Sequence, residues 1–459
     1  MNNGNVNNNN KNNNNYVWPV RVGEWSCCTP DAPVNLPAFD ILQVELFSSL
    51  YKSYLRCRRL KRNTINALDF EYRAELNLLD LSTELLNGNY SPSRAIRFAV
   101  DKPKLREIVA ADFRDRVVHH YLVEHLEKIF EPIFIHDSYA CRTGKGVHKA
   151  LLRAKEFIRK GTRNGRVPLY SLHLDVKNFF ITINKRILAD LIEDKLVKQA
   201  QKQIAVSRQN SKSLSPEKKN CVKTLPLSFL NYLARIVIAH NPMHNRIDKG
   251  DPHILAAVPP HKSLLYASPG VGLPIGNLTS QFFANVYLNE LDQYCKHTLK
   301  CRWYIRYCDD FLILDNNPQQ LAFIREKVRC FLRKQLRLEL NTRYASIKPV
   351  TSGIDFVGYI IRPDYTLVRR RSVNNFKCRL EKFQHNHVSK DTEGLLKIKA
   401  TKEELQHLRG IVASYCGHFK WGDTRRLRKS IFYRYPWLNA MYSLNRQTMP
   451  VKRDFFFNI

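Results

Sequence analysis

The spacing of apolar residues predicts a chain in which helices and strands alternate. Apolar side chains recur at helical spacing across 39–87, 111–130 and 278–296, whereas residues 94–110 alternate as a strand does. Residues 170–183 begin with the same period of two, which is typical of a strand with one buried face.

The C-terminal half continues this mixture. Residues 302–315 predict two short strands around a turn at Asp309-Asp310, and residues 354–370 predict a further strand pair. The last hundred residues otherwise carry helical patterns, at 373–387, 401–416 and 425–433. The whole pattern indicates an α+β core with helical ends.

Two stretches lack apolar periodicity. Eleven of the first fifteen residues are Asn, and such a tract cannot bury apolar area, so we expect it to be disordered. Residues 205–222 are rich in Ser, Lys and Gln and predict a loop.

The net charge of the chain indicates what kind of partner it binds. The chain has 74 Lys and Arg against 41 Asp and Glu, a net charge of +33. This charge favours a polyanionic partner, nucleic acid first and a membrane surface as the alternative. No apolar run is long enough for a membrane span, no signal peptide is evident, and the eleven cysteines have irregular spacing. We therefore expect a reduced, cytoplasmic protein that does not enter a membrane.

The acidic residues stand out in so basic a chain. Asp175 lies inside an apolar strand, where an unpaired carboxylate is costly, and Asp309 and Asp310 are adjacent at a predicted turn. Neighbouring carboxylates repel each other unless a cation offsets their charge, and Mg²⁺ prefers such oxygen ligands. Taken alone, Asp309-Asp310 also fits a solvated turn, and Asp175 also fits an ion pair with an arginine. The order of the surrounding motifs is therefore needed to choose between these explanations and a metal site.

In that order the motifs resemble the palm of reverse transcriptases. Leu174-Asp175-Val176-Lys177-Asn178-Phe179-Phe180 is similar to motif A, the segment 272–281 (GLPIGNLTSQ) to motif B, and Tyr307-Cys308-Asp309-Asp310 to motif C. The segments 102–118 and 138–146 resemble the fingers motifs, and 353–359 resembles the strand pair that grips the primer.

The resemblance implies a right-hand polymerase fold with fingers, an antiparallel palm sheet and a helical thumb. The domains expected from it are a disordered segment at 1–38, N-terminal helices and fingers at 39–168, a palm at 169–365 with an insertion at about 195–265, and a thumb and tail at 366–459.

The resemblance also implies site residues. It assigns two Mg²⁺ ions to the carboxylates of Asp175, Asp309 and Asp310 and to the carbonyl of Val176. It assigns the incoming nucleotide to Lys102, Arg106, Phe179, Phe180 and Ile275. It assigns the template and primer to Gly272, Pro274, Gly276, Asn277, Gln281, Tyr307, Gly358, Arg369 and Arg370.

The sequence of motif B indicates which reverse transcriptases the chain resembles most. It looks most like diversity-generating retroelements and their prokaryotic or phage-encoded relatives, in which an apolar residue at the position of Ile275 accompanies misincorporation opposite template adenines. The expected partners are a structured template RNA, the RNA–cDNA duplex, deoxynucleoside triphosphates and a small basic accessory protein. An antiphage-defence enzyme with its own noncoding RNA and a non-catalytic RNA-binding or splicing cofactor stay open as alternatives. Because Asn codons begin with two adenines, the N-terminal tract is either a disordered tail or a translated part of a template repeat.

The last segment carries much of the positive charge. Residues 361–459 contain 21 Lys and Arg against 8 Asp and Glu, which suits a thumb that follows a nucleic-acid backbone. The aromatic residues interleaved with these charges are expected to belong to the core, namely Tyr415, Phe419, Trp421, Phe432, Tyr433 and Trp437.

Overall fold

The structure is a computed structural model of the full chain. It describes residues 36–59, 64–101, 104–210, 226–342, 345–390, 392–444 and 450–452. Nearly all of the predicted disordered segment lies outside these residues, although the first helix already begins at Leu36. The chain divides into two compact units, each built from separate stretches of sequence.

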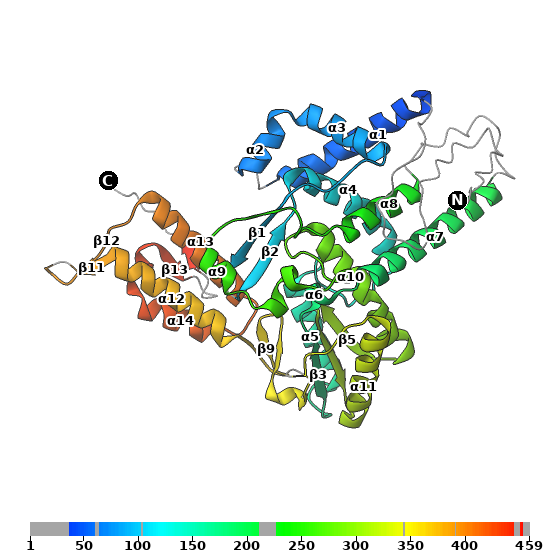
Figure 1. The fold of residues 1–459 in the computed structure, drawn as a ribbon. Coiled ribbons are helices and arrows are strands. Elements are labelled where there is room, and N and C mark those ends of the chain that lie inside the picture. Colours follow the sequence, from blue (N-terminus) through cyan, green and yellow to red (C-terminus); the bar gives the residue numbers. More distant parts are fainter. Residues whose placement is uncertain are drawn as a thin grey trace. The chain divides into compact units, whose positions relative to one another are not determined.

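The first unit contains residues up to Ile135, Val176–Tyr294 and Arg329–Leu340. Helices dominate it (Figure 1). They are α1 (Leu36–Arg58), α2 (Ile65–Tyr72), α3 (Ala74–Leu86), α4 (Phe113–Phe130), α6 (Phe179–Thr182), α7 (Lys185–Asn210), α8 (Leu227–Ala239), α9 (Pro252–Ala256) and α10 (Leu278–Gln293). One sheet in the order β2-β1-β4 completes it, from β1 (Ala95–Val100), β2 (Arg106–Ala110) and β4 (Arg246–Asp248).

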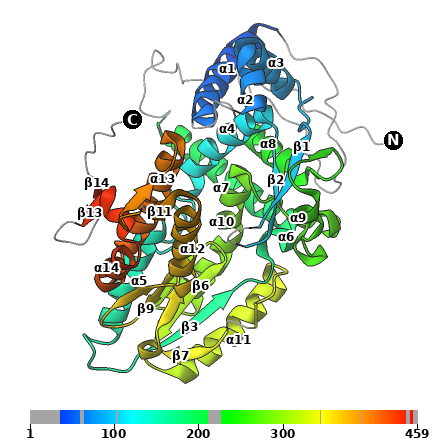
Figure 2. The same cartoon turned by 90° about the vertical axis from the view of Figure 1, so that its left-hand side faces the viewer.

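The second unit contains His136–Asp175, Cys295–Val328 and the residues from Asn341 onward. A four-stranded antiparallel sheet in the order β5-β6-β3-β7 forms its centre, and Figure 2 shows β6, β3 and β7 within it. Its strands are β3 (Tyr170–Asp175), β5 (Trp303–Tyr307), β6 (Asp310–Asp315) and β7 (Ile347–Pro349). A second antiparallel sheet consists of β8 (Ile354–Phe356), β9 (Tyr359–Ile361) and β10 (Thr366–Val368).

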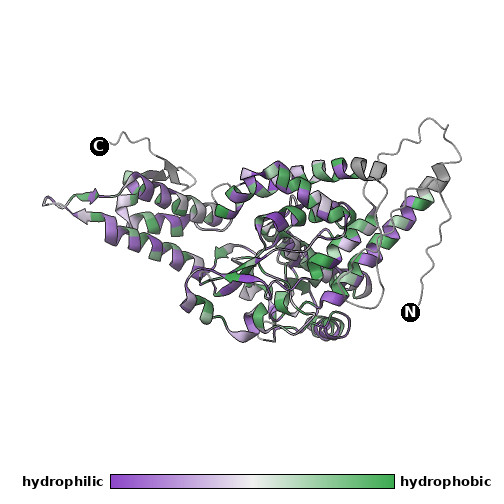
Figure 3. Ribbon diagram, turned by 45° about the horizontal axis from the view of Figure 1, so that its top comes forward, coloured by the Kyte–Doolittle hydropathy of each residue, from purple (hydrophilic) through white to green (hydrophobic). Residues whose placement is uncertain are grey.

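Helices and hairpins complete the second unit. Its helices are α5 (Val147–Gly161), α12 (Arg370–His387), α13 (Lys402–Phe419) and α14 (Arg425–Arg434), and α11 (Pro318–Gln335) runs through both units. Short hairpins are formed by β11 (Val388–Lys390) with β12 (Leu396–Ile398) and by β13 (Tyr442–Leu444) with β14 (Pro450–Lys452). Figure 3 shows apolar and polar residues alternating around the C-terminal helices, as amphipathic helices require. One core joins α5, β5 and β6 to the second sheet and to α12–α14.

The α+β class predicted from the sequence is confirmed, and most predicted elements occur where expected. Two predictions need correction. Residues 205–210 are helical, because α7 extends to Asn210, so the predicted loop 205–222 begins too early. The predicted strand pair at 354–370 is a sheet of three short strands that gives way to α12 at Arg370. The division into fingers, palm and thumb stays a prediction.

No helix in the described parts of the chain is both long enough and apolar enough to cross a membrane.

A buried ion pair holds the first unit's sheet to the loop before motif B. The Glu107 carboxylate, 3% exposed, accepts a hydrogen bond of 2.7 Å from Arg97 Nε. It also accepts 2.7 Å from Ser263 Oγ and 2.6 Å from the Leu264 backbone N–H. Arg97 Nη1 reaches the more exposed Asp248 at 3.0 Å. Glu107 is therefore the shared acceptor of the Arg97 side chain, the Ser263 hydroxyl and the Leu264 N–H.

We predict that Glu107→Gln lowers the free energy of unfolding by about 3 kcal/mol, because it leaves the Arg97 guanidinium buried with a weaker partner. The control is Asp248→Asn, which removes a carboxylate that is 42% exposed and should cost less than about 1 kcal/mol. Denaturation in guanidinium chloride measures both variants. Equal losses in the two variants would contradict this account.

Candidate active site

The register of two strands brings the predicted carboxylates together in the second unit. β3 pairs with β6 in antiparallel fashion, and Asp175 lies opposite Asp310. Opposed residues in such a ladder have Cα atoms about 5 Å apart. Asp309 immediately precedes β6, at the turn from β5. Residues of these strands that are fully or almost fully buried fix the register, namely Leu172, Leu174, Phe311, Leu312 and Ile313.

The turn between β5 and β6 has an unusual support. Cys308 adopts a left-handed backbone with φ of 58°, which an L-residue rarely occupies without help. Arg306 is fully buried, and its Nη1 donates a hydrogen bond of 3.0 Å to the Cys308 carbonyl. Arg306 also exchanges backbone hydrogen bonds with Asp137 and Tyr139. Sequence reasoning missed this residue, although an arginine inside the apolar strand 303–307 was a usable signal.

The site concentrates negative charge. Burial, and then the neighbouring Asp175 carboxylate, raise the pKa of Asp309 to about 6. A divalent cation held by oxygen ligands would remove this repulsion, so the chemistry of the donor set fits Mg²⁺.

The carboxylates are nevertheless engaged with other partners. His173 lies two residues before Asp175, on the same face of β3, and its Nε2 contacts Asp310 Oδ1. Burial opposes protonation of His173, but the Asp310 carboxylate raises the pKa of the imidazole overall. Asn341 Nδ2 donates a hydrogen bond of 3.1 Å to Asp175 Oδ2. Among the described residues, no set of three or more acidic, His or Cys side chains is already arranged as a metal cluster.

His173 and Asn341 are therefore functional candidates that sequence reasoning missed. The alternation along β3 could have pointed to His173, because it shares a face with Asp175. Nothing in the sequence pointed to Asn341, which approaches Asp175 only through folding.

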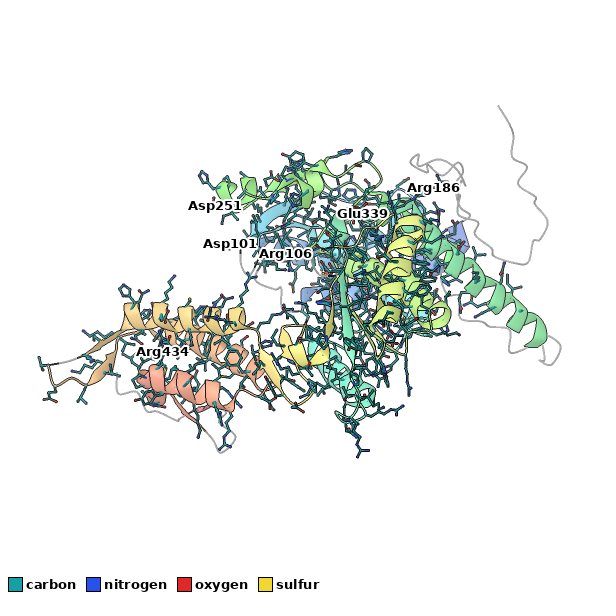
Figure 4. All side chains as sticks on the ribbon, turned by 90° about the horizontal axis from the view of Figure 1, so that it is seen from below. Asp101, Arg106, Arg186, Asp251, Glu339 and Arg434 are labelled. Atoms are coloured by element: carbon teal, nitrogen blue, oxygen red, sulfur yellow. The ribbon has the colours of Figure 1, made fainter. Side chains whose placement is uncertain are left out.

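The residues predicted to bind the nucleotide lie in the first unit, where motif B pairs with two other segments. The Val109 backbone N–H on β2 donates 2.8 Å to the Ile275 carbonyl, and the Leu273 N–H donates 2.7 Å to the Phe180 carbonyl. Ile275 and Phe180 are both half-buried. Arg106, labelled in Figure 4, is exposed at the start of β2. These backbone hydrogen bonds connect the segments that carry Arg106, Phe180 and Ile275, which are three of the residues predicted to bind the nucleotide.

Two glycines of motif B allow this close packing. A Cβ on Gly272, where φ is +94°, would meet Leu264 Cδ1 at 2.6 Å. A Cβ on Gly276, where φ is +128°, would meet Ile108 Cγ2 at 2.9 Å. Side chains at either position would therefore force motif B away from its neighbours. Asn277, buried beside them, accepts a hydrogen bond of 2.9 Å from the Ala111 N–H.

The remaining nucleotide and metal predictions are placed as follows. Lys102 lies outside the described residues. Phe179 is 2% exposed and packs against Phe180, so its side chain belongs to the core. Val176 is buried in the first unit, where it bridges to Leu340.

The predicted template and primer residues are dispersed. Pro274 is half-buried, and Gln281 is exposed on α10. In the second unit Tyr307 pairs with Asp310 across β5 and β6. Gly358 accepts a hydrogen bond from the Arg369 N–H, and the Arg369 side chain forms an ion pair with Asp355. Arg370 is exposed at the start of α12.

Comparisons with known proteins find similar sequences. The chain is 26% identical over 343 residues to the Escherichia coli (strain K12) protein YkfC, covering 67% of this chain and 75% of that one. It is 23% identical over 313 residues to the group II intron-encoded protein LtrA of Lactococcus lactis subsp. cremoris, covering 63% of this chain and 50% of LtrA. The chain is thus similar in sequence to YkfC and to a group II intron-encoded protein.

Solved structures of telomerase are also similar. The telomerase of Candida albicans in complex with a fragment of telomeric RNA matches 72% of this chain with a TM-score of 0.41 and 12% identity. The apo telomerase of Candida tropicalis matches 74% with a TM-score of 0.42 and 11% identity. The chain spans about half the length of LtrA and of these telomerase chains. No family model matches the chain.

We predict that Mn²⁺, as a spectroscopic substitute for Mg²⁺, binds about tenfold more weakly at pH 5 than at pH 7. The pKa of Asp309 is about 6 in the metal-free protein, so protons compete with the cation below that pH and not above it. Electron paramagnetic resonance of free Mn²⁺ measures the affinity.

Asp309→Asn should bind Mn²⁺ weakly, and its affinity should change less between these two pH values, because only the protonation of His173 beside Asp310 still opposes the cation. Asp364→Asn, which removes an exposed carboxylate, should keep the response of the unchanged protein. The same pH response in Asp309→Asn would contradict the assignment.

Proposed function

We propose that this chain is an RNA-directed DNA polymerase, which extends a primer along an RNA template with deoxynucleoside triphosphates. The observation that carries the proposal is the pairing of Asp175 with Asp310 across β3 and β6, with Asp309 at the adjoining turn. Three half-buried carboxylates at the end of two buried strands have a physical reason to lie together if they hold cations against a triphosphate.

In this proposal the chain's own residues divide the work. Asp175, Asp309 and Asp310 would hold two Mg²⁺ ions, and the Val176 carbonyl would be a further ligand. When bound, the ions would lower the charge barrier between the primer hydroxyl and the triphosphate. Arg306 keeps the turn at Cys308 in shape, which positions Asp309 and Asp310.

The nucleotide is bound by residues of the first unit. Lys102 and Arg106 bind the triphosphate, for which a guanidinium offers paired donors. Phe180 excludes a ribose 2′-hydroxyl, and Phe179 supports it from the core. Motif B, with Tyr307, Gly358, Arg369 and Arg370, contacts the template and primer.

We predict that Asp309→Asn lowers primer extension on an RNA template by at least about a hundredfold, because it removes one anionic oxygen ligand of a cation that stabilises the developing charge. Asp364→Asn is the matched control, because it is an exposed carboxylate and should extend primers normally. Gel analysis of a labelled primer gives the rate. Unchanged extension by Asp309→Asn would favour the alternative of a non-catalytic RNA-binding or splicing cofactor.

We further propose that the enzyme is error-prone at template adenines and serves a diversity-generating retroelement, together with a small basic accessory protein. Support comes from Ile275, whose carbonyl is tied to Val109 on β2, the strand that also carries Arg106. An apolar side chain there offers no hydrogen bond to the incoming nucleotide. The alternative is an antiphage-defence enzyme, which would need no such error pattern.

We predict that Ile275→Gln reduces misincorporation opposite template adenines by about fivefold, since one added hydrogen bond is worth about 1 kcal/mol. Ile275→Val keeps a branched apolar side chain and should keep the error rate. Deep sequencing of cDNA from each purified variant measures both. Errors spread evenly over the four template bases in the unchanged enzyme would favour the antiphage alternative.

A further inference from the structure

One face of α14 is basic and solvent-exposed throughout. At about 100° per residue, Arg425, Lys429, Tyr433, Arg426 and Ser430 follow each other around an arc of about 140°. All five are exposed, and Tyr433 is the most exposed large hydrophobic residue in the described chain, at 91%. The prediction that Tyr433 belongs to the core is therefore wrong, whereas it holds for its neighbour Phe432.

The other faces of α14 are already occupied. Arg428, Ile431 and Phe432 are buried. Arg434, labelled in Figure 4, donates 2.9 Å to Glu381 Oε1 on α12. The Tyr435 hydroxyl donates to the same oxygen. The exposed arc is thus the face that packing leaves over.

The charges on this arc are not neutralised within the described residues. α14 contains no acidic side chain, and Arg425, Arg426 and Lys429 form no ion pair with any described residue. On the helical wheel Tyr433 lies between Lys429 and Arg426, one turn along the helix from Lys429 and about two turns from Arg426, so the exposed ring shares its face with cations of the preceding turns. An anionic partner with flat, apolar groups matches this arrangement.

A second exposed tyrosine, Tyr72, differs from Tyr433 in the charges around it. Tyr72 at the end of α2 is 83% exposed, but the Arg73 guanidinium lies 5.8 Å from its ring centroid. Its neighbours along the chain include Asp69, Glu71 and Glu75. Exposure is similar at the two sites, whereas the local charge has the opposite sign.

We propose that the face of α14 formed by Arg425, Arg426, Lys429 and Tyr433 binds single-stranded nucleic acid, with an unpaired base stacked on Tyr433 and phosphates on the three cations. Duplex bases are already stacked on each other, so a ring that offers a stacking face favours an unpaired strand. The inference rests on the proposed function only for the source of the strand, a single-stranded part of the template RNA or the new cDNA.

Fluorescence anisotropy of the full chain tests this with oligouridylate and oligothymidylate of about 12 nucleotides and with a duplex of the same length. Tyr433→Ala should bind both single strands about tenfold more weakly and the duplex almost unchanged. Tyr433→Phe keeps the ring and should bind normally. Lys429→Ala should lower the dependence of log K on log salt by about one.

Tyr72→Ala is the matched control and should bind like the unchanged protein. Circular dichroism should show the same helix content in all variants, since both tyrosines are exposed. Three results would overturn the proposal: equal losses for Tyr433→Ala and Tyr72→Ala, an equal loss for the duplex, or Tyr433→Phe binding as weakly as Tyr433→Ala. Weaker binding of RNA alone assigns the face to the template, and of DNA alone to the cDNA.

Asp309→Asn separates this proposal from the catalytic one. It should bind single strands like the unchanged protein while failing to extend primers. If binding depends on Tyr433 but no variant extends primers, the polymerase proposal fails and this inference stands. If extension is normal but Tyr433 does not matter, only this inference fails.

Discussion

The pairing of β3 with β6 is the constraint on which the candidate site depends. Apolar residues on both strands are buried, so the register cannot slip by one residue without turning the core outward. That register sets Asp175 against Asp310, and the short turn adds Asp309 beside them. The carboxylates of Asp175 and Asp309 repel each other, and this repulsion contributes to the raised pKa of Asp309. Polar side chains from elsewhere in the chain contact the carboxylates and the turn that carries them.

Three polar side chains make these contacts, each with a different group. Asn341 donates to Asp175, His173 contacts Asp310, and Arg306 holds the carbonyl of Cys308 at the turn. Arg306 acts on the backbone and need not move when a cation arrives. His173 contacts a carboxylate oxygen directly, so a cation that takes Asp310 must share or displace this contact. The shape of the turn is therefore built into the scaffold, while the orientation of Asp310 is open to competition.

The sequence predicted those parts of the site whose residue types and order are distinctive, and it missed those that depend on contacts between distant segments. Asp175 was visible because carboxylates are rare in apolar strands, and Asp309-Asp310 because two adjacent carboxylates stand at a predicted turn of a basic chain. Asn341 lies 166 positions from Asp175 in the chain and has no local signal. The helix that extends to Asn210 was missed because residues 207–210 are all polar, so apolar periodicity does not mark its end.

The location of a binding surface also could not be predicted from the sequence. A net charge of +33 indicates a polyanionic partner but not where it binds. Helices α2 and α3 with the residue between them contain five acidic residues and one arginine, so the excess is not uniform. Aromatic residues interleaved with basic ones have the same pattern in sequence whether they are buried or exposed. Only the packing of α14, which buries Phe432 and leaves Tyr433 outside, separates a core residue from a surface that can contact a base.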